Sequence, residues 1–155
     1  MRVTMVKATV CGLVQIEGRV LLVRHTYGVA KDRILLPGGH VKEGEMPEQA
    51  VSREIFEETG VVAEPMGVIG VRLKLEEWLV LYRMKYVSGT PVTDGYENSE
   101  VLLLSPEEAA GREDITPLSR QMCLALWHER ILEMPYNSRL KFPGTPEDEY
   151  MIYGF

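Results

Sequence analysis

Short runs of apolar and β-branched residues, separated by turn signals, recur along most of the chain and predict β-strands. The expected strands cover residues 6–15, 19–24, 34–36, 61–75, 78–87 and 101–104. The fourth is expected to break at Pro65 and to resume at Val68, because proline cannot donate a hydrogen bond within a sheet. Pro37, Gly38 and Gly39 follow the third strand and are expected to end regular structure there.

Three segments have the composition and the end signals of helices. Residues 47–59 form the first, with a proline in the first turn and Gly60 as the left-handed residue that ends it. Ser105 and Pro106 open a second, short helix as its cap and its first residue. The third covers residues 118–133, where apolar side chains at helical spacing predict a face packed on the core: Leu118, Met122, Ala125 and Leu126.

The length of 155 residues suits one domain with a sizeable core and is short for two, so we expect a single domain over residues 1–155. Residues 134–155 hold three prolines and several aromatic side chains, and no regular structure is assigned to this tail. It could pack on its own domain, cover an active site or reach a second subunit, which leaves a homodimer open.

Composition and charge exclude some classes of function. No apolar run is long enough to span a bilayer, and the first seven residues lack the unbroken apolar segment of a signal peptide, so we expect a cytoplasmic protein with no membrane partner. Cys11 and Cys123 are accordingly expected to be buried free thiols. The net charge of −6 disfavours broad binding to nucleic acid. It would also repel a polyanionic substrate unless something local reversed the sign of the potential.

The first predicted helix carries an unusual concentration of acid. At 100° per residue, Glu54, Glu57 and Glu58 fall within an arc of roughly 100° on one face. Like charges at these spacings destabilise an isolated helix by roughly a few tenths of a kcal/mol per pair. The helix is therefore either a solvated acidic face or a site for hard cations, which prefer carboxylate oxygens.

The residues around this helix follow a longer pattern. Gly39 is followed after five residues by Glu45, and after seven more by the segment Arg53-Glu54-Ile55-Phe56-Glu57-Glu58-Thr59-Gly60-Val61. This resembles the signature of the Nudix hydrolases, GX5EX7REUXEEXGU with U an aliphatic residue, and every specified position is met. The resemblance implies the Nudix fold, in which a mixed β-sheet is sandwiched between helices (α/β/α).

The resemblance also implies a chemistry. Glu54, Glu57 and Glu58 would hold one to three Mg²⁺ or Mn²⁺ ions, with the carbonyl of Gly38 as a further ligand. These cations would reverse the local potential and allow water to attack phosphorus in a diphosphate linkage. Glu57 or Glu58 would also orient or deprotonate that water, and the sequence does not divide these roles. The expected substrate is a small nucleotide-derived molecule, either a nucleoside di- or triphosphate or another nucleoside diphosphate derivative.

Other residues of the signature have structural or binding roles by the same resemblance. Arg53 and Glu45 are expected to form a structural pair across the loop. Arg53 is also expected among the catalytic residues. Gly39 and Gly60 fit positions where backbone angles or close packing exclude a side chain, and Gly39 is expected beside the substrate.

Outside the signature, relatives often add an acid from a later loop as a base or ligand. Glu97 and Glu100 are the candidates, and Glu100 is favoured slightly. Arg24, at the end of a predicted strand, stands where relatives often contact a substrate phosphate, although strand-end arginines are also common without a function. His25 and His40 are interpreted as solvated loop residues rather than catalytic groups.

Two other classes of function remain as alternatives. One is a Nudix-fold module that senses a nucleotide without cutting it, and the other is an acidic helix with no metal. The intact signature, and the lack of any helix-turn-helix segment that would bind DNA, favour the hydrolase over both.

Overall fold

The structure is a computed structural model that describes residues 5–137 and 151–154. In chain order its elements are β1 (Lys7–Ile16), β2 (Arg19–His25), β3 (Ile34–Leu35), β4 (Gly38–His40), α1 (Pro47–Thr59), β5 (Val62–Leu73), β6 (Glu77–Ser88), β7 (Asn98–Leu104), α2 (Pro106–Gly111), α3 (Pro117–Trp127) and β8 (Met134–Pro135). No helix in these described ranges has both the length and the apolar character needed to cross a membrane.

Strand β1 is the centre of a mixed sheet. It runs parallel to β6 from Lys7 to Val14, and its end pairs antiparallel with β2. The strand order is β3-β2-β1-β6-β5-β8, while β4 pairs with β1 and β7 pairs with β2. Residues Thr9–Cys11 therefore have β6 on one side and the short strand β4 on the other.

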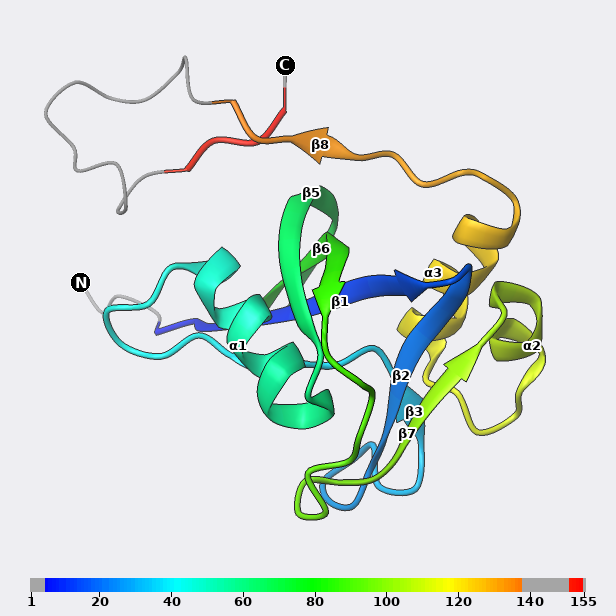
Figure 1. Ribbon diagram of the computed structural model, residues 1–155. Helices are drawn as coiled ribbons and strands as arrows, with labels where there is room; N and C mark the ends of the chain where they lie inside the picture. Colours follow the sequence, from blue (N-terminus) through cyan, green and yellow to red (C-terminus); the bar gives the residue numbers. More distant parts are fainter. Residues whose placement is uncertain (1–4, 138–150, 155) are drawn as a thin grey trace, which may run out of the picture.

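Helices cover both faces of this sheet, as expected for an α/β/α sandwich. Figure 1 shows α1 on one side and α2 with α3 on the other. The core under α1 contains Val51 and Ile55 of the helix together with Val10 and Tyr82 of the sheet. The second core contains residues of α2, of α3 and of the strands facing them, among them Ala109, Cys123, Leu22 and Leu81.

Helix α1 has the bounds that the sequence predicts. Its first turn contains Pro47, and the side chain of Gln49 accepts a hydrogen bond from the N–H of Met46 at 2.9 Å. Gly60 ends the helix with φ of 70° and donates its N–H to the carbonyl of Phe56 at 2.8 Å. A residue with a side chain would be strained at this left-handed position, so glycine sets the end of the helix.

The expectation that regular structure ends at Pro37 to Gly39 holds for β3, which stops at Leu35, but it is wrong for the two glycines, because the chain enters strand β4 at Gly38. A side chain at Gly38 would place its Cβ 2.1 Å from the carbonyl oxygen of Val10 and 2.6 Å from the Cα of Cys11. Glycine allows the two backbones to approach this closely. Glycine usually weakens a strand, but at position 38 it makes the pairing of β4 with β1 possible.

The expected break at Pro65 is also wrong, because β5 continues through it. Pro65 pairs with Met84 of β6, and the register shifts between Pro65 and Gly67. An irregularity of this kind accommodates the missing N–H without ending the strand.

The third predicted helix ends earlier than expected, at Trp127 instead of residue 133. Glu129 has φ of 53°, a left-handed conformation that cannot continue the helix, and the N–H of Arg130 closes the turn onto the carbonyl of Ala125 at 2.7 Å. Leu118, Met122 and Leu126 of the predicted stripe do pack against the core, as partly buried side chains.

The described parts of the tail pack on their own domain. Met134 and Pro135 form β8 and pair with β5, and the ring of Tyr153 meets that of Tyr82 edge-on at 5.9 Å. Residues 138–150 and 155 of the tail lie outside the described residues.

Cys11 and Cys123 are both free and buried, as expected. Burial raises the pKa of Cys11 to about 12 and that of Cys123 to about 11, so both thiols stay protonated at neutral pH.

Candidate active site

The acidic face of α1 lies against the free edge of β4. Alternate residues of a strand present their backbone groups to the same side, so Gly38 and His40 both turn toward α1 while Gly39 pairs with Val10 of β1. The N–H of Gly38 donates to Oε2 of Glu58 at 3.1 Å. The carbonyl of His40 accepts from Nη2 of Arg53 at 3.0 Å. The strand edge and the helix are thus joined by polar contacts at two points.

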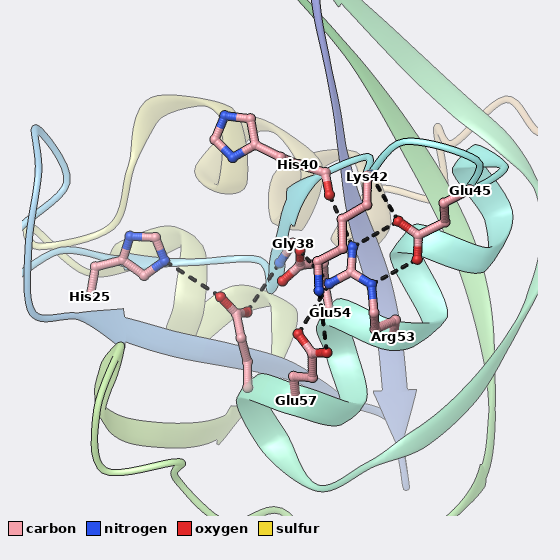
Figure 2. A network of polar contacts seen from close by, with 9 residues as sticks. His25, Gly38, His40, Lys42, Glu45, Arg53, Glu54 and Glu57 are labelled. Carbon is pink, nitrogen blue, oxygen red and sulfur yellow. Dashed lines mark hydrogen bonds and ion pairs between the residues drawn. The ribbon is translucent and has the colours of Figure 1, made fainter.

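Arg53 is the centre of the polar network in Figure 2. It holds Glu45 through two bonds, Nε to Oε1 at 2.7 Å and Nη2 to Oε2 at 2.9 Å, which is the pair expected from the sequence. The bond from Arg53 lowers the pKa of Glu45 to about 2, assisted by the N–H of Lys42 and opposed by partial burial. This fork fixes the loop between β4 and α1 to the helix.

Arg53 also balances two glutamates of the acidic face. Its Nη1 donates to Oε1 of Glu54 at 2.7 Å and to Oε2 of Glu57 at 3.0 Å. Lys42 approaches Glu57 from the preceding loop, with Nζ 3.8 Å from Oε1. Glu54 is nearly buried, whereas the side chain of Glu57 is 50% exposed and has room to move.

Glu58 is the most buried acid of the site, at 2% exposure. Its partners are the N–H of Gly38 and, at 3.8 Å from Oε1, the Nε2 of His25. Burial raises the pKa of Glu58, and the contacts with His25 and Gly38 offset only part of that rise. A bound cation would compensate for the burial of this carboxylate.

Gly39 provides the space for Glu54. A Cβ at this position would lie 2.5 Å from the carboxyl carbon of Glu54 and 2.6 Å from its Oε1. The missing side chain therefore lets the carboxylate rest directly on the strand.

The residues present fit a divalent cation in type and number. Glu54, Glu57 and Glu58 supply hard oxygen ligands, and the carbonyl of Gly38 faces the same edge of β4 as its N–H, toward Glu58. Within residues 5–137 and 151–154, no group of three or more His, Cys, Asp or Glu side chains is arranged to hold an ion as it stands. The contacts of Arg53 explain this, because they turn Glu54 and Glu57 toward the guanidinium.

Arg24 and Glu100 do not join this group. They are partners in the register of β2 and β7, and Nε of Arg24 donates to Oε2 of Glu100 at 2.8 Å. Nη1 of Arg24 donates to Asp114, between α2 and α3, at 2.9 Å. The two side chains thus face the side of the sheet opposite α1. The predicted roles of Arg24 as a phosphate contact and of Glu100 as an additional acid would require them on the α1 side.

The interpretation of His25 as a solvated loop residue is wrong, because it ends strand β2 with a side chain only 15% exposed, and the sequence analysis did not single out Tyr27. Consecutive strand residues point to opposite faces, so His25 turns toward α1 where Arg24 turns away. Tyr27 stacks on His25 with ring centroids 5.5 Å apart. The pKa of Tyr27 is raised first by burial and then by the charges of Glu97, Glu58 and Glu54. Glu97 lies beside this loop, because its carbonyl accepts the N–H of Thr26 at 3.0 Å. The alternation of β2, with Leu21 in the core under α1, was the available signal for His25.

A hollow of about 330 Å³ lies elsewhere, between the start of α1 and the C-terminal segment. Its walls are mainly apolar and include Val68, Val80 and Tyr153. Glu54, Glu57 and Glu58 do not line this hollow, so it is separate from the candidate cation site.

The fold and the site together define a class of protein, an α/β/α domain in which an acidic helix packs on a glycine-rich strand edge. The family model described as NUDIX domain matches residues 3–126. The chain therefore belongs to the Nudix family.

Curated relatives are similar over part of their length. An ADP-ribose pyrophosphatase of Methanocaldococcus jannaschii is 39% identical over 60 residues, covering 39% of this chain and 36% of the relative. A protein named putative 8-oxo-dGTP diphosphatase of Bacillus subtilis is 40% identical over 73 residues, covering 46% of this chain and 49% of the relative. The chain thus spans between about a third and a half of the length of these two relatives.

Solved structures share the fold. A NUDIX hydrolase from Nitrosomonas europaea superposes with a TM-score of 0.74 at 22% identity, covering 85% of this chain and 78% of that one. This agreement confirms the mixed sheet with flanking helices that the sequence predicts.

Proposed function

We propose that this chain is a divalent-cation-dependent hydrolase that cleaves a diphosphate linkage in a nucleotide-derived substrate. The observation that carries the proposal is the position of Glu58. It is a buried carboxylate whose Oε1 lies 3.8 Å from Nε2 of His25, and it lies on the same helix face as Glu54 and Glu57. Relatives named as pyrophosphatase and diphosphatase support the reaction class.

Mg²⁺ or Mn²⁺, as one to three ions, would neutralise diphosphate charge and lower the pKa of bound water. Glu54 and Glu58 would hold such ions from fixed positions, because both side chains are largely buried. Glu57 is half exposed and would turn from Arg53 toward them. The carbonyl of Gly38 would complete the oxygen ligands at the edge of β4.

The remaining residues of the signature position these ligands. Arg53 keeps the helix, the loop and β4 together through Glu45 and His40. When Glu57 turns from Arg53 toward the ions, the guanidinium of Arg53 would remain as a positive charge beside the acidic face of α1. Gly39 keeps the strand surface flat where Glu54 and the substrate meet.

We further propose that Glu97, and not Glu100, supplies the additional acid. The carbonyl of Glu97 accepts the N–H and the hydroxyl of Thr26, the neighbour of Tyr27, at 3.0 and 2.9 Å. The charges of Glu97, Glu58 and Glu54 all raise the pKa of Tyr27. Glu100 is engaged by Arg24 on the other side of the sheet. Replacing Glu97 by Gln should lower the rate by about tenfold or more, whereas Glu100→Gln should leave it within a factor of about three.

The test of the reaction is a panel of nucleoside di- and triphosphates, ADP-ribose and other nucleoside diphosphate derivatives, incubated with and without Mg²⁺ or Mn²⁺. Chromatography follows the loss of each compound and the appearance of its monophosphate products, phosphate or pyrophosphate. Cleavage of at least one compound only in the presence of the cation is expected. Tight binding with no cleavage of any compound would instead indicate a nucleotide sensor.

The roles of individual glutamates are tested by isosteric variants. Glu57→Gln and Glu58→Gln should each lower turnover by about two orders of magnitude or more, because each removes a negative oxygen from the cation site. The thermal unfolding of both variants should stay close to that of the unchanged protein. Unchanged turnover in both would remove them from the mechanism.

The place of action and the oligomeric state are part of the proposal. We propose a cytoplasmic protein, in agreement with its two reduced, buried thiols. A homodimer would show in size-exclusion chromatography with light scattering, at twice the 17.6 kDa mass of the chain.

A further inference from the structure

Tyr27 forms an aromatic stack that leads from the buried glutamate to the surface. Its ring lies on that of His25 with an interplanar angle of 10° and a centroid separation of 5.5 Å. The side chain of His25 is 15% exposed, with Nε2 3.8 Å from Oε1 of Glu58. Tyr27 itself is 53% exposed. One face of its ring therefore covers His25, and much of the remaining surface is open to solvent beside the candidate cation site.

The loop that carries Tyr27 is anchored at its base. The N–H of Thr26 donates to the carbonyl of Glu97 at 3.0 Å, and its hydroxyl reaches the carbonyls of Tyr96 and Glu97 at 3.0 and 2.9 Å. His25 exchanges backbone bonds with Arg33 and Asp32 at 3.1 and 2.9 Å on the other side. These bonds hold the stack in place before any ligand arrives, which lowers the entropy lost on binding.

The chemistry of an open aromatic face selects one part of a nucleotide. A nucleobase has a flat π-surface that stacks on tyrosine largely regardless of its hydrogen-bonding edge. A diphosphate is repelled by the carboxylates nearby unless a cation intervenes, and a sugar has no π-surface. If a nucleotide binds with its diphosphate at α1, its base is the only part that can stack on the ring of Tyr27.

We propose that the Tyr27 ring, supported by His25, is the stacking platform for the base of a nucleoside diphosphate substrate. This inference rests on the proposed function and names the substrate class of the same site. It predicts that the protein distinguishes a nucleotide from a base-free diphosphate by the contact with Tyr27. Tyr27 is then a specificity-determining residue that touches the substrate away from the reacting phosphorus.

Calorimetric titration with two non-cleavable probes tests this inference. The probes are α,β-methylene-ADP and methylenediphosphonate, which share a phosphorus–carbon–phosphorus linkage and differ in the nucleoside. With Mg²⁺ present, Tyr27→Leu should weaken binding of α,β-methylene-ADP by about tenfold and leave binding of methylenediphosphonate unchanged. Tyr27→Phe should keep wild-type affinity for both, because the ring is retained.

Tyr96→Leu is the matched control, since Tyr96 is 85% exposed on the loop that contacts Thr26. It should change neither affinity by more than about twofold. Equal affinities of Tyr27→Leu and wild type for the nucleotide, or an equal loss for both probes, would overturn the inference. So would a wild type that binds the nucleotide no better than methylenediphosphonate. Because binding is measured without turnover, these results are separate from failure to cleave any diphosphate, which would overturn the proposed function.

Discussion

The two adjacent glycines of β4 serve different purposes. A methyl group at Gly38 would meet the backbone of Val10 and Cys11, which cannot move without separating two strands. The atoms nearest to a methyl group at Gly39 would be those of the Glu54 carboxylate, the far end of a side chain. Gly38 is therefore required for the fold, and Gly39 for the position of a site residue.

This difference gives a test with a built-in comparison. Gly39→Ala should stay folded and lose about tenfold or more in turnover, because Glu54 is displaced. Gly38→Ala should lower the free energy of unfolding by several kcal/mol, on the order of a severe core overpacking. Circular dichroism melting and the turnover assay measure both. A Gly39→Ala variant with full activity would show that Glu54 does not need its present position.

Glu45 connects the site to acid stability. Its pKa in the folded protein, about 2, lies below the value of about 4.3 for an unfolded chain. The pair with Arg53 therefore adds stability that is fully present above the unfolded pKa and is lost as the pH falls toward 2.

Glu45→Gln should lower the free energy of unfolding at pH 7 by about 2 kcal/mol, and by less at pH 3, where the wild type has already lost part of the contribution. Glu43→Gln, an exposed acid in the same loop, is the control and should have little effect at either pH. Urea unfolding at the two pH values measures both variants. An effect of Glu45→Gln that does not shrink at low pH would contradict this assignment.

For individual residues, the sequence predicts those contacts whose partners are close along the chain. Glu54, Glu57, Glu58, Arg53 and Glu45 lie on one helix and its preceding loop, so their spacing already determines their proximity. Residues that meet across the sheet were harder to predict, because the outcome depends on which face each one takes.

The helix and the sheet meet at Gly12, where β1 passes under α1. A Cβ there would lie 2.6 Å from Cδ1 of Ile55, 2.8 Å from Cγ of Met84 and 3.1 Å from Cγ2 of Val51. The missing side chain sets the distance between helix and sheet, and with it the position of the glutamates that α1 carries.

Gly12→Ala should lower the free energy of unfolding by about 1–3 kcal/mol through overpacking. Gly111→Ala, at the end of α2 with no atom within 4 Å of the added Cβ, should be neutral or slightly stabilising. Chemical denaturation compares the two. Equal stability of the Gly12→Ala variant and the wild type would mean that α1 adjusts freely on the sheet.

The elements themselves show where sequence patterns suffice. Helix α1 was predicted to the residue, because proline and glycine mark both ends and the apolar face is continuous. The short strands β4 and β8 were not predicted, because their pairing with β1 and β5 depends on partners distant in sequence. Pro65 was misjudged for a related reason, since a local rule cannot anticipate the register shift that accommodates it.

On the scale of the whole molecule, the C-terminal segment is a separate contribution to stability. Tyr153 packs against the core under α1 through Tyr82, away from the acidic face. Tyr153→Ala should lower the free energy of unfolding by about 1–3 kcal/mol and leave turnover unchanged. Tyr96→Ala, an exposed tyrosine, should stay within about 0.5 kcal/mol of the wild type. A loss of turnover in Tyr153→Ala at full stability would place the segment at the active site.

The whole chain has a net charge of −6 and its candidate site concentrates three of the acids, so a phosphorylated substrate needs a cation there. The most direct test is titration of Mn²⁺, followed by electron paramagnetic resonance, into the wild type and into a variant with Glu54, Glu57 and Glu58 all changed to Gln. Saturable binding by the wild type, lost in a variant that remains folded, is the expected result. Equal binding by both, or none by the wild type at millimolar Mn²⁺, would contradict the assignment of these glutamates as cation ligands.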